Sequence, residues 1–123
     1  MKASLKNFHV NSWVGPAEFR PNNPQCFGFW LTAEIGAEEA VGTELFQIFV
    51  CNKAWLDRGP SSIPEYGTIR PRQRHVVVAD PYDEGSVRAR LEKYLDGCEG
   101  ESWEEVVEQV ARIGFSEYED YHP

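Results

Sequence analysis

The pattern of hydrophobic and polar positions is strongest between Leu45 and Cys51, where both alternating sets of side chains are largely apolar. A strand with apolar side chains on both faces lies in the interior of a sheet, so this run predicts a central strand. Asn52 follows it directly and can begin a helical turn that brings Trp55 and Leu56 back onto the sheet. We therefore expect the domain to be built around this strand.

Two segments before the central strand also alternate between apolar and polar side chains. Leu5–Val14 alternates loosely, which is typical of a half-buried strand near a sheet edge. Cys26–Ile35 alternates strongly and predicts a strand with one core-facing side. Its predicted core face carries Phe27, Phe29, Leu31, Ala33 and Ile35, and its other face carries Gly28, Trp30, Thr32 and Glu34. Turn-forming residues at 36–42 lead into the central strand and predict an antiparallel hairpin.

The C-terminal half of the chain changes to helical spacing. His75–Asp80 is a short β-branched run that predicts a fourth strand. After it, Asp83 can cap a helix, and Ser102 with Glu105 forms a capping box for a second one. The apolar stripes of these helices are Val87, Leu91, Tyr94, Leu95 and Cys98, then Trp103, Val106, Val107, Val110 and Ile113. We therefore predict an α+β fold, a mainly antiparallel sheet of about four strands with two C-terminal helices packed antiparallel on one face.

A chain of 123 residues is expected to form one domain, residues 1–123, around one hydrophobic core. Its N-terminus has no apolar run of signal-peptide length, and no window approaches the ~20 apolar residues of a membrane span. We therefore expect a cytoplasmic protein without membrane contact. Cys26, Cys51 and Cys98 are odd in number and far apart in sequence, which favours reduced thiols over disulfides.

The net charge of −8 arises in the last third of the chain. Residues 1–80 carry eight Lys/Arg and eight Asp/Glu, whereas residues 81–123 carry four and twelve. Such a field attracts a basic partner and repels nucleic acid, although the same acids would also suit a solvated helix face. The only basic cluster, Arg70, Arg72 and Arg74, lacks interleaved aromatic residues. We expect no nucleic-acid binding.

No motif in the sequence is typical of a catalytic or metal site. His9, His75 and His122 lie in three separate predicted elements. A pair of Cys51 and His75 on two strands is conceivable, but burial makes a thiol inert. The acids at the start of the second helix suit the positive end of the helix dipole and need no reaction to explain them. We predict that the protein is not an enzyme and has no catalytic residues, no cofactor and no metal.

A set of short motifs runs in order along nearly the whole chain. The first are Phe27-Gly28-Phe29, Glu34-Ile35-Gly36, Glu44-x-Phe46-x-Ile48-x-Val50-Cys51 and Lys53-x-Trp55-Leu56. The later ones are Arg74-His75, Glu99-Gly100-x-Ser102-Trp103 and Gly114-Phe115-x-Glu117-Tyr118-Glu119-Asp120-Tyr121. Together they resemble the immunity protein 8 family of bacterial polymorphic toxin systems. The proline-rich segment 57–71 is longer than in that family, and a variable loop there would bear on partner choice.

The resemblance implies a protein made beside a toxin gene, which binds the toxin's activity domain and blocks it without catalysis. Such toxin domains are often nucleases with basic substrate-binding surfaces, so an acidic surface could cover one. The predicted toxin-binding residues are Glu104, Glu105, Glu108, Glu117, Glu119 and Asp120, with Trp30, Tyr66 and Tyr118 as aromatic anchors. For Trp30, cover by the first strand or a loop is the competing structural interpretation. We expect a monomer or a weak homodimer.

Two other functions stay open on the residues alone. The first is a structural or adaptor module that self-associates through an exposed sheet edge or the face with Trp30. The second is a small hydrolase that uses His75 with Cys51 or a carboxylate. A gene for a large secreted toxin beside this one would favour the immunity function over both.

Overall fold

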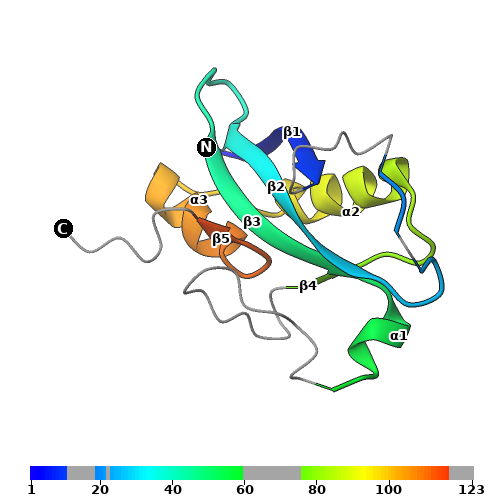
Figure 1. Cartoon of the computed structure of the whole chain (residues 1–123). Coiled ribbons are helices and arrows are strands. Elements are labelled where there is room, and N and C mark those ends of the chain that lie inside the picture. Colours follow the sequence, from blue (N-terminus) through cyan, green and yellow to red (C-terminus); the bar gives the residue numbers. More distant parts are fainter. Residues whose placement is uncertain (11–18, 22, 60–75, 117–123) are drawn as a thin grey trace.

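β3 (Glu44–Cys51) lies at the centre of the sheet, and its last six residues are buried. The computed structural model describes residues 1–10, 19–21, 23–59 and 76–116 (Figure 1). β3 pairs along one edge with β2 (Gly28–Ala37), and β2 pairs with β1 (Ala3–Val10), both in antiparallel orientation. The predicted central strand and its antiparallel hairpin are therefore confirmed.

The other edge of β3 is shared by two short strands. β4 (Val76–Val78) pairs with Phe49–Cys51 in parallel orientation, and β5 (Phe115–Ser116) pairs with Phe46 and Gln47 in antiparallel orientation. The sheet is therefore mixed, with β4 as the parallel exception to the predicted mainly antiparallel arrangement. The chain between β3 and β4, residues 52–75, is long enough for the crossover that a parallel pair requires.

Three predicted strand boundaries differ from the structure. The first strand begins earlier than predicted, at Ala3, and its predicted end at residues 11–14 lies outside the described residues. β2 is shifted by two residues and ends at Ala37, because residues 36 and 37 still pair with β1. β4 is shorter than predicted, and His75 lies outside the described residues.

A β-bulge in β1 explains why its alternation in the sequence is loose. The pairing register with β2 shifts between Leu5 and Asn7, so the side chains on either side of the bulge follow different parities. Ala3 and Phe8, which are an odd number of residues apart, are both buried in the main core. A pure period of two would have placed one of them on the opposite face of the sheet.

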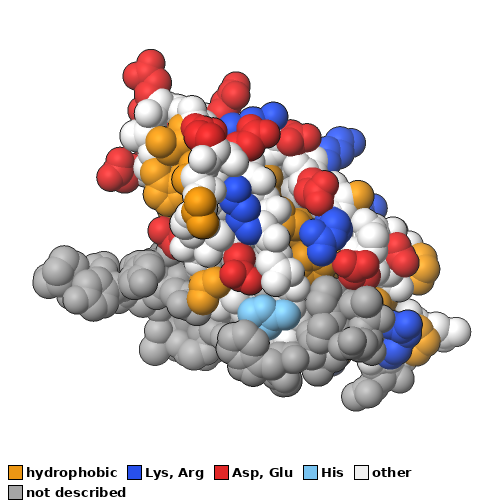
Figure 2. Space-filling model, turned by 90° about the horizontal axis from the view of Figure 1, so that it is seen from above, with side chains coloured by type: hydrophobic (Ala, Val, Ile, Leu, Met, Phe, Trp, Pro, Cys, Tyr) orange, Lys and Arg blue, Asp and Glu red, His pale blue; other side chains and the backbone are white. Residues whose placement is uncertain are grey.

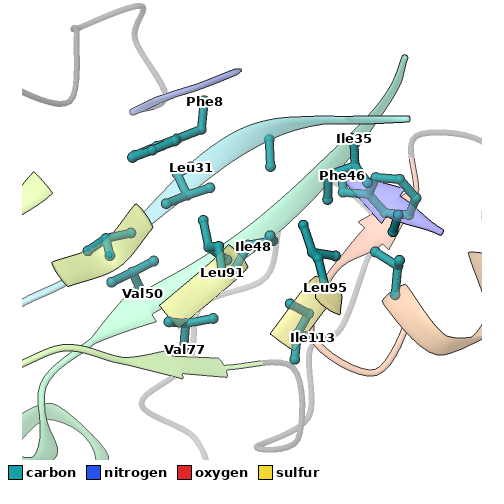
Figure 3. Packing of buried hydrophobic residues seen from close by; sticks show 14 of the residues in the cluster. Phe8, Leu31, Ile35, Phe46, Ile48, Val50, Val77, Leu91, Leu95 and Ile113 are labelled. Atoms are coloured by element: carbon teal, nitrogen blue, oxygen red, sulfur yellow. The ribbon is translucent and has the colours of Figure 1, made fainter. Parts of the chain in front are cut away.

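Helices in the C-terminal half cover one face of the sheet. α2 (Glu84–Asp96) is capped at its N-terminus by Asp83, whose carboxylate accepts a hydrogen bond from the Ser86 backbone N–H at 2.9 Å. α3 (Trp103–Val110) has Ser102 as its N-cap, as the sequence predicted. Figure 3 shows α2 side chains directed at the strands, with Leu91 and Leu95 beside Ile48 and the other core residues. No helix in the described ranges has the length and apolar character needed to span a membrane.

The opposite face of the sheet carries a second, smaller cluster. Phe49 and Cys51 are fully buried there, and Trp30, Trp55 and Leu56 pack against them. The two aromatic rings that α1 (Lys53–Leu56) and β3 contribute, Trp55 and Phe49, have centroids 6.1 Å apart. The predicted return of Trp55 onto the sheet is confirmed, and it explains why both faces of β3 are apolar.

Candidate functional site

Three segments that are distant in the sequence meet at one end of the molecule. They are the N-terminus, the hairpin between β2 and β3, and the start of α3 (Figure 1). The Met1 ammonium group donates a hydrogen bond to the Gly100 carbonyl at 2.8 Å, and the Gly100 N–H donates to the Met1 carbonyl at 2.9 Å. The Ala3 N–H donates to the Cys98 carbonyl at 3.0 Å. These bonds tie the N-terminus to the turn between the two helices.

A shallow groove of about 340 Å³ lies where these segments meet. The residues that line it are Met1, Gly36, Ala37, Ala40, Gly42, Thr43, Glu44 and Trp103. The two large hydrophobic residues that are exposed in the described part of the chain also belong to this end, Met1 with 48% and Val41 with 98% exposure. Single exposed apolar residues are ordinary, but here they adjoin a groove and a half-buried indole. We call this set, Met1, Ala40, Val41 and Trp103, the hairpin-end patch.

Exposed acidic residues lie in the two elements that contribute to the hairpin-end patch, the hairpin and α3. Glu38 and Glu39 are exposed in the hairpin, and the acids around the start of α3 are exposed as well. The latter are Glu101, Glu104, Glu105 and Glu108. Figure 2, which views the molecule from above relative to Figure 1, shows acidic side chains with hydrophobic and basic ones between them. An apolar centre with a charged rim is the usual anatomy of a protein-binding surface.

Of the acids on α3, Glu105 has a structural role, whereas Glu104 and Glu108 have none among the described residues. Glu105 has a capping role, because its N–H donates to the Ser102 hydroxyl at 3.3 Å and its carboxylate accepts from the N–H of Glu101, the residue before the N-cap, at 3.0 Å. Glu104 and Glu108 have no such role and make no ion pair or hydrogen bond among the described residues. They lie four residues apart on one helix face, where like charges repel by a few tenths of a kcal/mol.

The other predicted binding residues are placed differently or lie outside the described ranges. Trp30 lies on the sheet face opposite the helices, with its ring centroid 5.3 Å from that of Phe49. The structure therefore does not bring Trp30 next to the acids of α3, and its described ring contact is with Phe49 of β3 and not with the first strand. Tyr66, Glu117, Tyr118, Glu119 and Asp120 all lie outside the described residues.

Sequence reasoning missed the hairpin-end patch. Trp103 was assigned only to a core stripe, and in the structure it packs partly against the core while also lining the groove. Val41 had one available signal, since it is a β-branched apolar residue inside a segment of turn formers that needs no apolar side chain. Which other residues surround it was not visible, because the N-terminus and α3 approach the hairpin only in the folded chain.

The described residues offer little for catalysis. Burial, and to a smaller degree the nearby Cys26 thiol, raises the pKa of the Cys51 thiol to about 11. At neutral pH this thiol is protonated and a poor nucleophile. The described cysteines are all free, and among the described residues no three His, Cys, Asp or Glu side chains gather as a metal ion would require. His75 and His122 lie outside the described residues, so the Cys51–His75 pair stays a hypothesis.

The fold and this surface define a small α+β domain whose exposed end has the features of a protein-binding module. Comparison with protein families then identifies which one. The sequence model of the family described as immunity protein 8 matches residues 3–121, so the chain belongs to that family. The resemblance inferred from the short motifs is thereby confirmed. No curated protein and no solved structure matches the chain significantly.

Proposed function

We propose that this protein neutralises a cognate polymorphic toxin by binding its activity domain, and that it does so without catalysing a reaction. The observation that carries the proposal is the family match over residues 3–121, because immunity is the function that this family is named for. The protonated, buried Cys51 thiol supports a non-catalytic role. In this proposal the protein acts in the cytoplasm as a monomer or weak homodimer.

The binding surface in this proposal is the acidic start of α3 together with the hairpin-end patch. Glu104 and Glu108 are exposed and have no structural partner among the described residues, so their charges are available to another molecule. Trp103 is of the residue type that often carries much of the energy at protein interfaces, and Val41 adds exposed apolar area. Glu117, Tyr118, Glu119 and Asp120 would extend the acidic field, and Trp30 and Tyr66 stay candidates for contacts elsewhere.

A basic toxin surface is the complement that this acidic end favours. Nucleases bind phosphate through such surfaces, so a nuclease domain is the toxin that we propose first. Long-range attraction between opposite charges raises association rates about 10- to 1000-fold at low salt, and the gain falls as ionic strength rises. A rigid acidic surface would therefore capture a basic toxin quickly, and apolar contacts would then set how long the complex lasts.

The first test is a calorimetric titration with the C-terminal domain of the toxin encoded beside this protein. We expect a 1:1 complex with a Kd well below 1 μM. No complex at micromolar concentration would contradict the proposal for that pair. If the complex forms and the toxin is a nuclease, its cleavage of DNA or RNA should stop at equimolar protein.

The second test reverses charges on α3. Glu104→Lys with Glu108→Lys should lower the association rate at low salt by about tenfold or more and flatten its salt dependence. Asp57→Lys with Glu92→Lys is the matched control, since both residues are exposed, lie outside α3 and give the same change of net charge. An equal effect of the two pairs would mean that net charge alone matters and that α3 does not face the toxin.

A further inference from the structure

A second groove, of about 470 Å³, lies between the C-terminal parts of α2 and α3. Its walls carry three exposed cations, Arg90 and Lys93 from α2 and Arg112 from the turn after α3. Tyr94, Gly97, Cys98 and Gln109 complete the lining. Among the described residues that line this groove none is acidic, although acids outnumber bases by 20 to 12 in the whole chain. The described lining is therefore positively charged, opposite in sign to the net charge of the chain.

The groove is held in shape by hydrogen bonds between its two walls. The Tyr94 hydroxyl donates to the Gln109 carbonyl at 2.7 Å, which joins α2 to α3. The Gln109 side chain in turn donates to the carbonyls of Glu99 at 2.7 Å and Glu105 at 3.2 Å, and it accepts from the Glu99 N–H at 3.1 Å. A half-buried tyrosine and a fully hydrogen-bonded glutamine thus hold in place the two helices that carry the cations. The backbone of such a site need not be ordered when a ligand binds.

The three cations form no ion pair within the described part of the chain. Its ion pairs join Lys2 to Asp96 at 3.6 Å and Arg88 to Glu84 at 3.3 Å, so they involve other residues. Arg90 and Lys93 lie three residues apart on one helix face, where like charges repel. Only Lys93 is in the last turn of its helix, where a cation is favoured by the helix dipole. Helix stability therefore does not explain Arg90, whereas Arg112 directly follows the C-cap of α3, where the helix dipole also favours a cation.

We propose that this groove binds an acidic segment of a protein partner, through carboxylates that pair with Arg90, Lys93 and Arg112. Guanidinium groups bind carboxylates in bidentate fashion, and the half-buried Tyr94 offers an aromatic wall for the aliphatic part of a Glu side chain. A volume of about 470 Å³ accommodates a few side chains, not a folded element. This inference goes beyond the proposed immunity function, since the acidic surface of α3 would select the opposite charge.

A nucleic acid fits this groove less well than a carboxylate segment. Glu108 lies one helical turn before Arg112, and the other acids of α3 lie closer to the N-terminus of the same helix. A phosphate backbone that leaves the groove would pass within a Debye length, about 8 Å at physiological salt, of these carboxylates. A short acidic peptide does not extend as far beyond the groove, so it meets less of this repulsion.

The test uses isotope-labelled protein and a hexaglutamate peptide as the probe, followed by NMR at low salt. We expect amide shifts confined to the last turns of α2 and to residues 109–113, and weaker binding as salt is added. Arg90→Gln with Arg112→Gln should weaken binding about tenfold or more. Lys6→Gln with Lys53→Gln removes two exposed cations outside the groove and should change the affinity less than about twofold.

Three outcomes would overturn the proposal. The first is no shift at millimolar peptide, and the second is equal binding by the two double variants. The third is tighter binding of a hexathymidylate oligonucleotide than of the peptide at the same residues, which would make the groove a nucleic-acid site. The spectrum of each variant reports its folding directly, and Lys93→Gln alone offers a milder variant with an expected loss of about threefold. No toxin is used, so the result is independent of the test of toxin neutralisation.

Discussion

The side chain of Asn52 forms hydrogen bonds with three backbone groups in two segments from inside the protein. Its carbonyl oxygen accepts hydrogen bonds from the N–H groups of Phe27 at 3.2 Å and Trp55 at 3.1 Å. Its amide nitrogen donates to the Gln25 carbonyl at 2.9 Å, and the residue is only 1% exposed. One residue therefore begins α1 and also fixes the entry into β2. The sequence indicated the first role, and only the folded chain revealed the second.

Asn52→Ala should lower the free energy of unfolding by about 3 kcal/mol, because it leaves buried backbone groups without hydrogen-bond partners. Urea denaturation followed by circular dichroism measures this change. Asn23→Ala is the control, since the Asn23 side chain accepts one hydrogen bond, from the Gln25 N–H at 3.0 Å, at an exposed site. Its expected cost is about 1 kcal/mol or less. Equal losses in the two variants would contradict the connecting role of Asn52.

Among the elements, α3 depends most on its cap. It has only eight residues, which is short for an isolated helix in water, so packing and the terminal hydrogen bonds together maintain it. Its buried residues, Val106 and Val110, attach it to the core. Gly100 leaves room for Glu105, because a Cβ atom there would lie 2.7 Å from the Glu105 carboxylate oxygen. The element that presents the acidic surface is therefore positioned by its own first turn.

Ser102→Ala should destabilise the protein by about 1 kcal/mol, since the N–H of Glu105 then loses its side-chain acceptor. The measurement is a thermal or urea transition. Ser86→Ala is the matched control, because Ser86 lies inside α2 and its side chain does not cap the helix. That control should be neutral or slightly stabilising, given the higher helix propensity of alanine. A loss in Ser86→Ala as large as in Ser102→Ala would argue against the cap.

At the scale of the whole molecule, the two grooves lie in regions of opposite charge. The elements that contribute to the hairpin-end patch carry exposed acids, and the groove between the helices is lined by cations. Both are lined by residues of α3 or of the turn after it. Acidic side chains lie on this short helix, and the cation Arg112 lies just after its end. Such an arrangement would orient a docking partner as well as attract it.

Val41→Asn should leave the free energy of unfolding within about 0.5 kcal/mol of the original value, because the side chain is 98% exposed. If the hairpin-end patch binds the toxin, the same change should raise the dissociation rate of the complex by about tenfold, since it removes apolar area without altering charge. Surface plasmon resonance measures that rate. Val41→Ile keeps the apolar contact and should behave like the original protein. An unchanged dissociation rate in Val41→Asn would place the patch outside the interface.

Much of the fold could be predicted from local periodicity. The apolar run of β3, the alternation of β2, the stripes of the two helices and the caps at Asp83 and Ser102 are properties of neighbouring residues. The parallel pairing of β4 was not predictable in this way, nor was the pairing of β5 with Phe46 and Gln47. Both depend on how the chain returns to β3 after long excursions.

The candidate site could likewise be predicted only where it depends on residues that are neighbours in the sequence. That the acids around Glu104 and Glu108 would be exposed on α3 could be inferred from the helix stripe, because they fall on its polar side. That the start of α3 meets Met1 and the hairpin could not, and Trp30 proved to lie on the opposite sheet face. Spacing along one element determines which way a side chain points. It carries no information about which other element will lie beside it.

The sequence by itself determined the elements, the buried faces, the excess of negative charge and the family, since each of these is written in the order of nearby residues or in motifs along the chain. The tertiary structure alone decided the strand order, the hairpin-end patch and the groove of Arg90, Lys93 and Arg112. The physical reason is that these features form between segments separated by many residues. Their meeting is set by the packing of the whole core, to which every element contributes.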